Sequence, residues 1–62
     1  MQQRSEETRS KIIESAIKLF SKRGFNAARV DDICKDAGIS KGAFYHHFES
    51  KQALFLALLD GW

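Results

Sequence analysis

The chain has 62 residues, of which 44% are hydrophobic, and its formal net charge is +2 at pH 7. A chain of this length forms one small domain that buries roughly 60% of the surface its unfolded form exposes, which argues against a long catalytic cleft. The absence of proline favours compact helices with tight turns over linkers or low-complexity sequence. The single cysteine, Cys34, excludes an internal disulfide, and no Cys/His spacing matches a zinc module.

The chain shows no basic-then-apolar leader at its start and no apolar run of about 18 residues, the length that a membrane-spanning helix needs. We therefore expect a soluble protein of the reducing cytoplasm with no membrane partner. The charge is unevenly distributed: residues 1–29 contain seven Lys/Arg and three Glu, whereas residues 30–62 contain three Lys and five Asp/Glu. No acidic residue lies between Asp36 and Glu49, so this stretch suits contact with a polyanion.

The first predicted helix begins near Ser5 or Thr8, because either hydroxyl can cap the free backbone amides of a helix start. Gly24 supplies a left-handed stop at its end, and Phe25 is expected to fold back under it. The expected apolar stripe consists of Ile13, Ala16, Ile17 and Phe20, widened by Ile12 and Leu19.

The second predicted helix is carried by four apolar positions: Val30, Ile33, Cys34 and Ala37. Its start has a poor cap, because Arg29 stands where a hydroxyl is usual, so Asp31 and Asp32 must supply most of the favourable interaction with the helix dipole. Gly38 ends this helix, and the small Cys34 side chain lets it cross the next helix closely.

The third predicted helix is capped by Ser40 and has two distinct faces. Phe44 and Phe48 are four residues apart and share the apolar face. The opposite face carries Lys41, Gly42, Tyr45 and His46. Two helices joined by a three-residue turn that contains glycine form a helix-turn-helix, so we predict an all-α, three-helix fold of this kind followed by the start of a fourth helix.

The fourth predicted helix is capped by Ser50 and is strongly apolar. Its expected stripe consists of Leu54, Phe55, Leu58 and Leu59, with Ala53 and Ala57 alongside. Because a helix of this kind needs more protein to cover it, we expect residues 1–62 to be the front portion of a longer protein.

The residues that carry a family resemblance are Thr8-Arg9, Ile13, Ala16, Leu19-Phe20, Gly24-Phe25, Val30-Asp31-Asp32-Ile33, Ala37-Gly38-Ile39-Ser40, Lys41-Gly42-Ala43-Phe44-Tyr45-His46-His47-Phe48 and Lys51 to Leu54. Together they resemble the DNA-binding domain of the tetracycline-repressor (TetR) family of bacterial transcription regulators. The resemblance implies a helix-turn-helix whose fourth helix links to a larger ligand-binding and dimerisation domain that these residues do not include.

Members of this family are typically homodimers that bind palindromic operators and release them when a small-molecule inducer binds. The resemblance therefore implies a bacterial, nucleoid-associated repressor. Two positions depart from the family pattern. Ala28 and Arg29 stand where Thr or Ser is usual before Val30, so the phosphate contact and helix cap of this corner are either lost or taken over by the Arg29 guanidinium. Cys34 replaces an alanine.

Four residues of the third helix are the candidates for reading bases: Lys41, Gly42, Ala43 and Tyr45. An ammonium can donate to guanine acceptors in the major groove, which favours Lys41. Gly42 costs a helix roughly 1 kcal/mol relative to alanine, a loss that close approach to DNA would explain. Ala43 could touch a thymine methyl, or it could simply be a good helix former.

The candidates for phosphate contact are Arg29, Ser40, Tyr45, His46, His47 and Lys51. For His47, phosphate contact or partial burial is favoured over metal binding, because adjacent helical side chains diverge and no third ligand is near. A cation such as Lys51 is unfavourable in the first turn of a helix unless an anion binds there too. The five phenylalanines, Phe20, Phe25, Phe44, Phe48 and Phe55, are assigned to the core, as is Cys34.

The leading hypothesis is sequence-specific binding of double-stranded DNA, with no cofactor and no metal. The alternative is a helical protein-interaction module that uses the apolar face of residues 53–62. An enzyme is not expected, because no nucleophile, carboxylate pair or metal cluster converges.

Overall fold

The computed structural model describes residues 4–60 of the chain, and this part forms four α-helices and no strand. The helices are α1 (Arg4–Arg23), α2 (Val30–Ala37), α3 (Lys41–His47) and α4 (Lys51–Leu59). The predicted all-α class and helix-turn-helix order are confirmed. No helix within residues 4–60 is long and apolar enough to cross a membrane.

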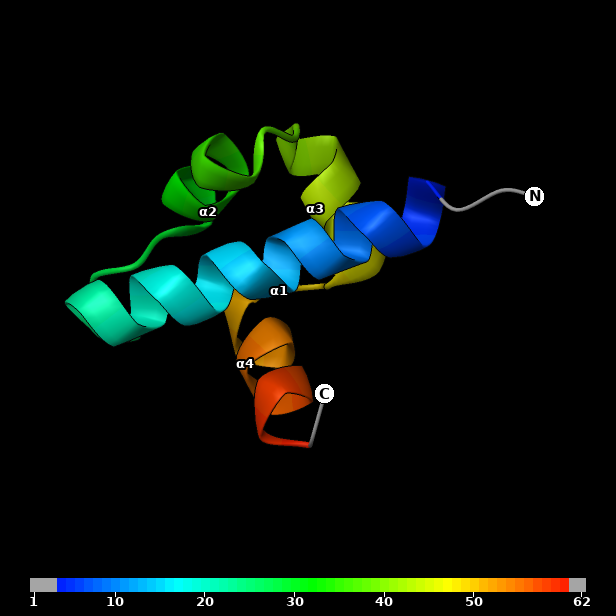
Figure 1. The fold of residues 1–62 in the computed structure, drawn as a ribbon. Helices are drawn as coiled ribbons and strands as arrows, with labels where there is room; N and C mark the ends of the chain where they lie inside the picture. The colour runs from blue at the N-terminus through cyan, green and yellow to red at the C-terminus, as the bar shows by residue number, and fades with distance from the viewer. Residues whose placement is uncertain (1–3, 61–62) are drawn as a thin grey trace.

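Helix α1 is the long central element of the fold (Figure 1). Helices α2 and α3 lie along one side of it, with α2 towards its C-terminal end and α3 towards its N-terminal half, while α4 lies on the other side. The buried side chains that join these elements are Ile12, Ile13, Ala16, Leu19, Ala28, Ile33, Cys34, Phe44, Phe48 and Leu54.

The apolar stripe of α1 is rotated relative to the prediction. Ile12 and Leu19, expected only to widen the stripe, are 0% and 6% exposed, whereas Ile17 is 43% exposed. The buried face must serve helices on two sides, and the sequence pattern does not show where those partners lie. The prediction that Ile17 belongs to the buried stripe is therefore wrong.

The start of α1 also differs from the prediction. The helix already includes Arg4, so Ser5 and Thr8 lie inside it and neither is its cap. The predicted stop is confirmed, because Gly24 has a φ of 86° and its amide N–H donates to the carbonyl oxygen of Phe20 at 2.8 Å.

The turn between α2 and α3 is built entirely from local bonds. Gly38 adopts a φ of 73°, and its amide donates to the carbonyl oxygen of Lys35 at 3.3 Å. The amide of Ile39 donates to the carbonyl oxygen of Cys34 at 3.0 Å, which completes a Schellman motif. Ser40 then caps α3, because its Oγ accepts from the amide of Ala43 at 3.1 Å.

Asp32 stabilises the start of α2, as expected from the absence of a hydroxyl at the cap position. The Asp32 carboxylate accepts from the amide of Arg29 at 3.3 Å and pairs with the Arg23 guanidinium at 3.0 Å. The carboxylate thus satisfies a backbone donor at the helix start and also ties α2 to the end of α1.

Helix α4 buries a narrower face than predicted. Its cap is confirmed, because the Ser50 Oγ accepts from the amide of Ala53 at 3.0 Å. Leu54 is fully buried, but Leu59 is 67% exposed together with Leu56 at 63%. The helix is apolar around most of its circumference, so periodicity alone could not separate the face that Leu54 buries from the open face that carries Leu56 and Leu59.

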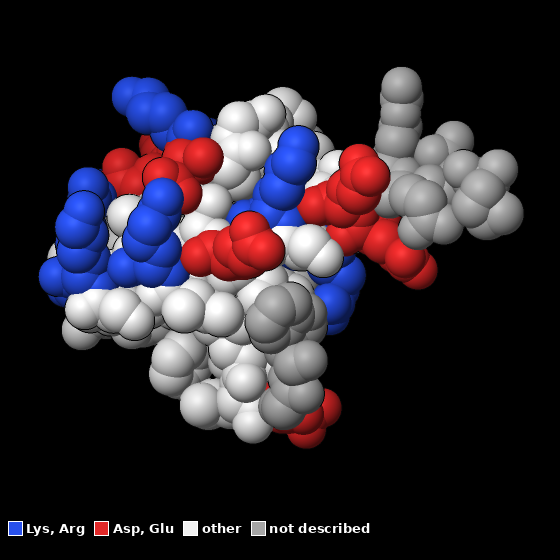
Figure 2. Space-filling model, viewed as in Figure 1, with Lys and Arg blue, Asp and Glu red and all other residues white. Residues whose placement is uncertain are grey.

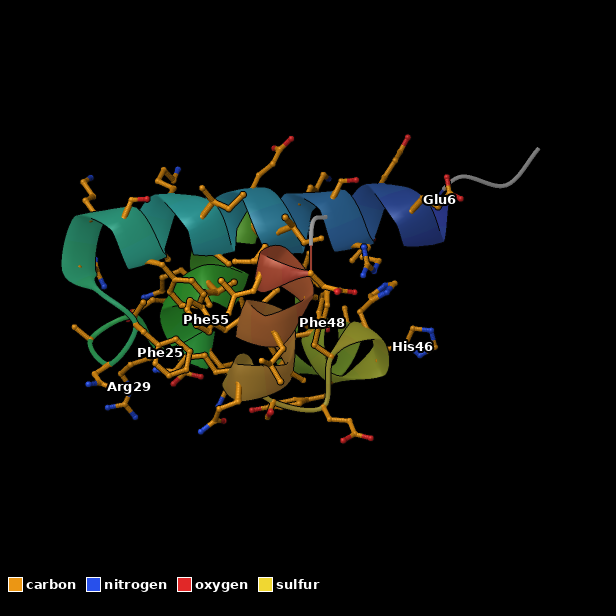
Figure 3. All side chains as sticks on the ribbon, turned by 90° about the horizontal axis from the view of Figure 1, so that it is seen from below. Glu6, Phe25, Arg29, His46, Phe48 and Phe55 are labelled. Carbon is orange, nitrogen blue, oxygen red and sulfur yellow. The ribbon has the colours of Figure 1, made fainter. Side chains whose placement is uncertain are left out.

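Phe44 and Phe48 are buried as expected, whereas the other three phenylalanines are only half-buried. Phe20, Phe25 and Phe55 pack on one another, with ring centroids 5.0 to 5.8 Å apart. Figure 3 shows Phe25 and Phe55 side by side. This cluster joins α4 to α1 and to the loop that follows α1, as predicted for Phe25.

Candidate nucleic-acid interface

The outward face of α3 is open, as the sequence predicts. Lys41, Gly42, Tyr45 and His46 are exposed, and half of the Tyr45 side chain is accessible even though its ring packs edge-on against buried Phe44, with centroids 5.1 Å apart. Ala43 is half-buried. A polar, solvent-facing helix surface therefore sits on an aromatic anchor that fixes its direction.

An open hollow of about 640 Å³ adjoins this face, and we call it the α2–α4 hollow. It is lined by Asn26, Ala27, Arg29, Val30, Asp31, Lys41, Tyr45 and Lys51. The hollow brings together three cations and one tyrosine that were predicted separately as DNA contacts, from the loop after α1 and from α3 and α4. Ser40 and Gly42 lie on α3 and its cap, outside this lining.

Asp31 is the residue of this surface that the sequence reasoning missed. Its Oδ1 lies 2.8 Å from Nζ of Lys41, although no acidic residue lies between Asp36 and Glu49 in the sequence. The hydrogen bond to Lys41 holds the pKa of Asp31 below its usual range, and the same bond raises the pKa of Lys41. The leading base-reading candidate is thus paired with an acid from another helix.

Lys51 has partners within the chain. Its ammonium donates to the carbonyl oxygens of Phe25 and of Ala28, the latter at 3.0 Å, and it lies 4.2 Å from the centroid of the Phe25 ring. These groups offset the cost of a cation at a helix start, so a bound anion is not needed to explain Lys51 there. Contact between Lys51 and a phosphate remains a prediction, but the position of this cation at a helix start no longer supports it.

Ser40 and Gly42 differ in how far the fold explains them. The Ser40 Oγ accepts one bond as the helix cap, which leaves its hydroxyl hydrogen free to donate to a phosphate oxygen. A Cβ added at Gly42 would meet only the Ser40 Oγ, at 3.7 Å, which is ordinary van der Waals contact. Packing within the described residues therefore does not require glycine at this position.

Gly42→Ala is expected to act in opposite directions on folding and on DNA binding. Alanine should raise the free energy of unfolding by about 0.5–1 kcal/mol, because it removes the entropic cost of glycine in a helix. The added methyl group should weaken binding to operator DNA if α3 approaches the duplex closely. Thermal unfolding and DNA titrations of the same sample measure the two effects, and unchanged DNA affinity would contradict close approach at this residue.

The two histidines lie apart from Arg29. Figure 3 shows Arg29 beside the loop after α1 and His46 at the opposite end, beside α3. His46 is exposed and His47 half-buried, with their ring centroids 5.1 Å apart. Partial burial, followed by the charges of His46 and Arg9, lowers the pKa of His47. No group of three potential metal ligands forms among the described residues.

The lowered pKa of His47 predicts a pH-dependent stability. The unfolded histidine takes up a proton near pH 6.5, whereas the folded one resists it. The contribution of His47 to stability is therefore present above about pH 6.5 and is lost as the pH falls towards the pKa of the folded state. His47→Gln should flatten the fall in unfolding free energy between about pH 7 and 5, and an identical slope in both proteins would contradict this.

The visible face of α1 is not a uniformly basic surface. Figure 2 shows Lys and Arg side chains beside Asp and Glu side chains over α1, while the surface over α4 is largely uncharged. The exposed side of α1 therefore offers a polyanion mixed charges rather than a continuous basic surface.

Comparison with known proteins shows which family the chain belongs to. Residues 12–58 match the sequence model of the family described as bacterial regulatory proteins, tetR family. The chain belongs to the tetR family. The match spans α2, α3 and the turn between them, so the resemblance noted in the sequence is confirmed.

Three proteins similar to this chain are named as HTH-type transcriptional regulators. An uncharacterized regulator of Bacillus subtilis, YerO, is 51% identical over 87% of this chain and 19% of its own length. The Escherichia coli regulator UidR is 44% identical over 95% of this chain and 30% of its length. IcaR, the Staphylococcus aureus negative regulator of the biofilm operon icaADBC, is 43% identical over 76% of this chain and 25% of its own length.

The chain thus spans less than a third of the length of these relatives. No solved structure matches it.

Proposed function

We propose that residues 1–62 form the DNA-binding domain of a longer tetR-family regulator and bind one half-site of a palindromic operator. In this proposal α3 enters the major groove, where Lys41, Gly42, Ala43 and Tyr45 face the bases. The backbone contacts come from Arg29, Ser40, Tyr45, His46, His47 and Lys51. The domain acts by binding rather than by catalysis.

One observation carries the proposal beyond the family match. The α3 face is polar and exposed, and the glycine within it is not required by the packing of the described residues. A helix that accepts the cost of glycine without an internal reason is most simply explained by an external surface that comes close. The open hollow beside that face carries Arg29 and Lys51, cations that suit the duplex backbone, together with the Asp31–Lys41 pair.

The wider role is proposed from the relatives. The name of IcaR describes a negative regulator, which supports repression. We propose that the full-length protein is a homodimer and that a small-molecule inducer binds outside residues 1–62. Such a regulator would act on the bacterial nucleoid in the cytoplasm.

The test is selection of bound sequences from random DNA with the full-length protein, followed by titration of the selected duplex at several salt concentrations. A palindromic consensus is expected, with affinity falling steeply as salt rises because bound cations release counterions. Tyr45→Ala should weaken binding without lowering the unfolding temperature of the domain appreciably. Failure to enrich any sequence, or a flat salt response, would contradict the proposed function.

A second candidate, a protein-interaction surface, is favoured by exposed Leu56 and Leu59 on α4. With Ala53, Ala57 and Asp60 they line a shallow groove within the predicted face of residues 53–62, of which Gly61 and Trp62 lie outside the described residues. Replacing both leucines by serine separates the two functions. If the variant no longer self-associates but still binds DNA when it is covalently linked as a dimer, the leucines form an interaction surface separate from the DNA-binding face.

A further inference from the structure

The Asp31–Lys41 ion pair joins two helices at the edge of the proposed reading face. Asp31 is the second residue of α2 and Lys41 is the first of α3, and their charged atoms lie 2.8 Å apart. The side chains are 58% and 62% exposed, so neither is confined by burial. Both line the α2–α4 hollow, where a duplex would approach.

We infer that Asp31 is a specificity-determining residue that acts through Lys41. It holds the ammonium for contact with a base and away from the phosphates. This inference rests on the proposed function, because it concerns how the same surface discriminates between DNA sequences.

The first physical reason is the freedom of a lysine side chain. Its flexible four-carbon stem carries a strongly hydrated point charge. Without a partner, the exposed ammonium of Lys41 would pair with whichever phosphate lies nearest, and phosphate contacts carry no sequence information. The carboxylate of Asp31 favours positions of the ammonium close to α2, at the start of the helix that would enter the groove.

The second reason is donor capacity. A lysine ammonium has three N–H donors, and Asp31 uses one of them. Two donors remain, which is the number that a guanine can accept through O6 and N7 in the major groove. Pairing with Asp31 therefore orients Lys41 without preventing base contact.

The third reason concerns competing DNA. A carboxylate beside the duplex repels phosphates, and this repulsion weakens binding to every sequence alike. Positioning of Lys41 restores affinity only where the matching base is present. The pair therefore raises the ratio of specific to non-specific affinity, although it lowers the non-specific affinity itself.

The chain offers a matched control in the Lys18–Asp36 pair. It also joins two helices, α1 and α2, with its charged atoms 2.9 Å apart. Both members lie outside the lining of the α2–α4 hollow. Asp36→Asn therefore makes the same change in net charge on the same helix as Asp31→Asn, at a position that does not contact Lys41.

The experiment measures dissociation constants of the full-length protein for its selected operator and for a scrambled duplex of equal length. Asp31→Asn is expected to bind the scrambled duplex more tightly and to lower the specificity ratio by roughly 10-fold, about the discrimination expected of one base contact. The salt slope for the scrambled duplex should steepen by about one, because the released ammonium gains a phosphate. Asp36→Asn should leave the ratio within about 2-fold of wild type, as expected for a distant and independent site.

A double-mutant cycle tests whether Asp31 acts through Lys41. In a Lys41→Ala background, Asp31→Asn should change the specificity ratio by less than about 2-fold. Thermal unfolding of each variant confirms that the domain is folded.

Three outcomes overturn the inference. Asp31→Asn could match Asp36→Asn, which would reduce the effect to net charge. The effect could persist in the Lys41→Ala background, which would indicate that Asp31 contacts DNA itself. A wild-type protein that does not discriminate between the duplexes would remove the proposed function, whereas the first two outcomes leave that function intact.

Discussion

Phe44→Ala is expected to lower the free energy of unfolding by about 3–5 kcal/mol, the range for truncating a buried aromatic side chain. Phe44 is fully buried and packs against the rings of Tyr45 and Phe48, whose centroids lie 5.1 and 6.0 Å from its own. A domain below about 70 residues rarely draws more than 3–5 kcal/mol from its core, so this loss should leave it largely unfolded at room temperature. Circular dichroism during denaturant titration measures the effect.

The neighbouring residue supplies the control for this prediction. Tyr45 follows Phe44 on the same helix but has half of its side chain in solvent. Tyr45→Ala should therefore change the unfolding free energy far less than Phe44→Ala does. If the two variants unfolded at the same denaturant concentration, the assignment of one aromatic ring to the core and the other to the DNA-facing surface would be wrong.

Lys51→Met is expected to lower the free energy of unfolding by about 1.5–3 kcal/mol in the absence of DNA, the range for hydrogen bonds that involve a charged group. Methionine keeps much of the apolar stem but removes the ammonium that binds the carbonyl oxygens of Phe25 and Ala28 and faces the Phe25 ring. Because the measurement contains no DNA, any loss reports the contacts within the chain.

Lys11→Met is the control, because Lys11 is an exposed lysine within α1. A surface substitution of this kind should stay within about 0.5 kcal/mol of wild type. Equal stability of Lys51→Met and Lys11→Met would show that the carbonyl contacts add nothing, and would return Lys51 to a role in phosphate binding alone.

The helix boundaries that were predicted well depend on short-range chemistry. Gly38, Ser40 and Ser50 each act through bonds to residues at most five positions away, so their effect can be read from neighbouring letters. The division of α3 into a buried and an exposed face follows from helical periodicity in the same way. These local signals were enough to predict the helix-turn-helix.

The errors arise where distant segments meet. Asp31 and Lys41 are ten positions apart, and Lys51 reaches a loop 23 to 26 positions earlier, so neither partner is apparent from local sequence. Ile17 was placed in the buried stripe of α1 because periodicity shows that a helix has an apolar side but not which part of it is covered. Contacts such as the Asp31–Lys41 ion pair can therefore be found only from the tertiary structure.

The connection between α2 and α3 also limits how this domain can diverge in evolution. Each of its three residues meets a different demand: Gly38 needs a positive φ, the amide of Ile39 closes the end of α2, and the Ser40 hydroxyl opens α3. An insertion or deletion here would break at least one of these and would rotate α3 relative to α1. Relatives should therefore vary freely in the side chains that α3 exposes while keeping the length of this connection constant, so that new DNA preferences arise by substitution on a helix of fixed direction.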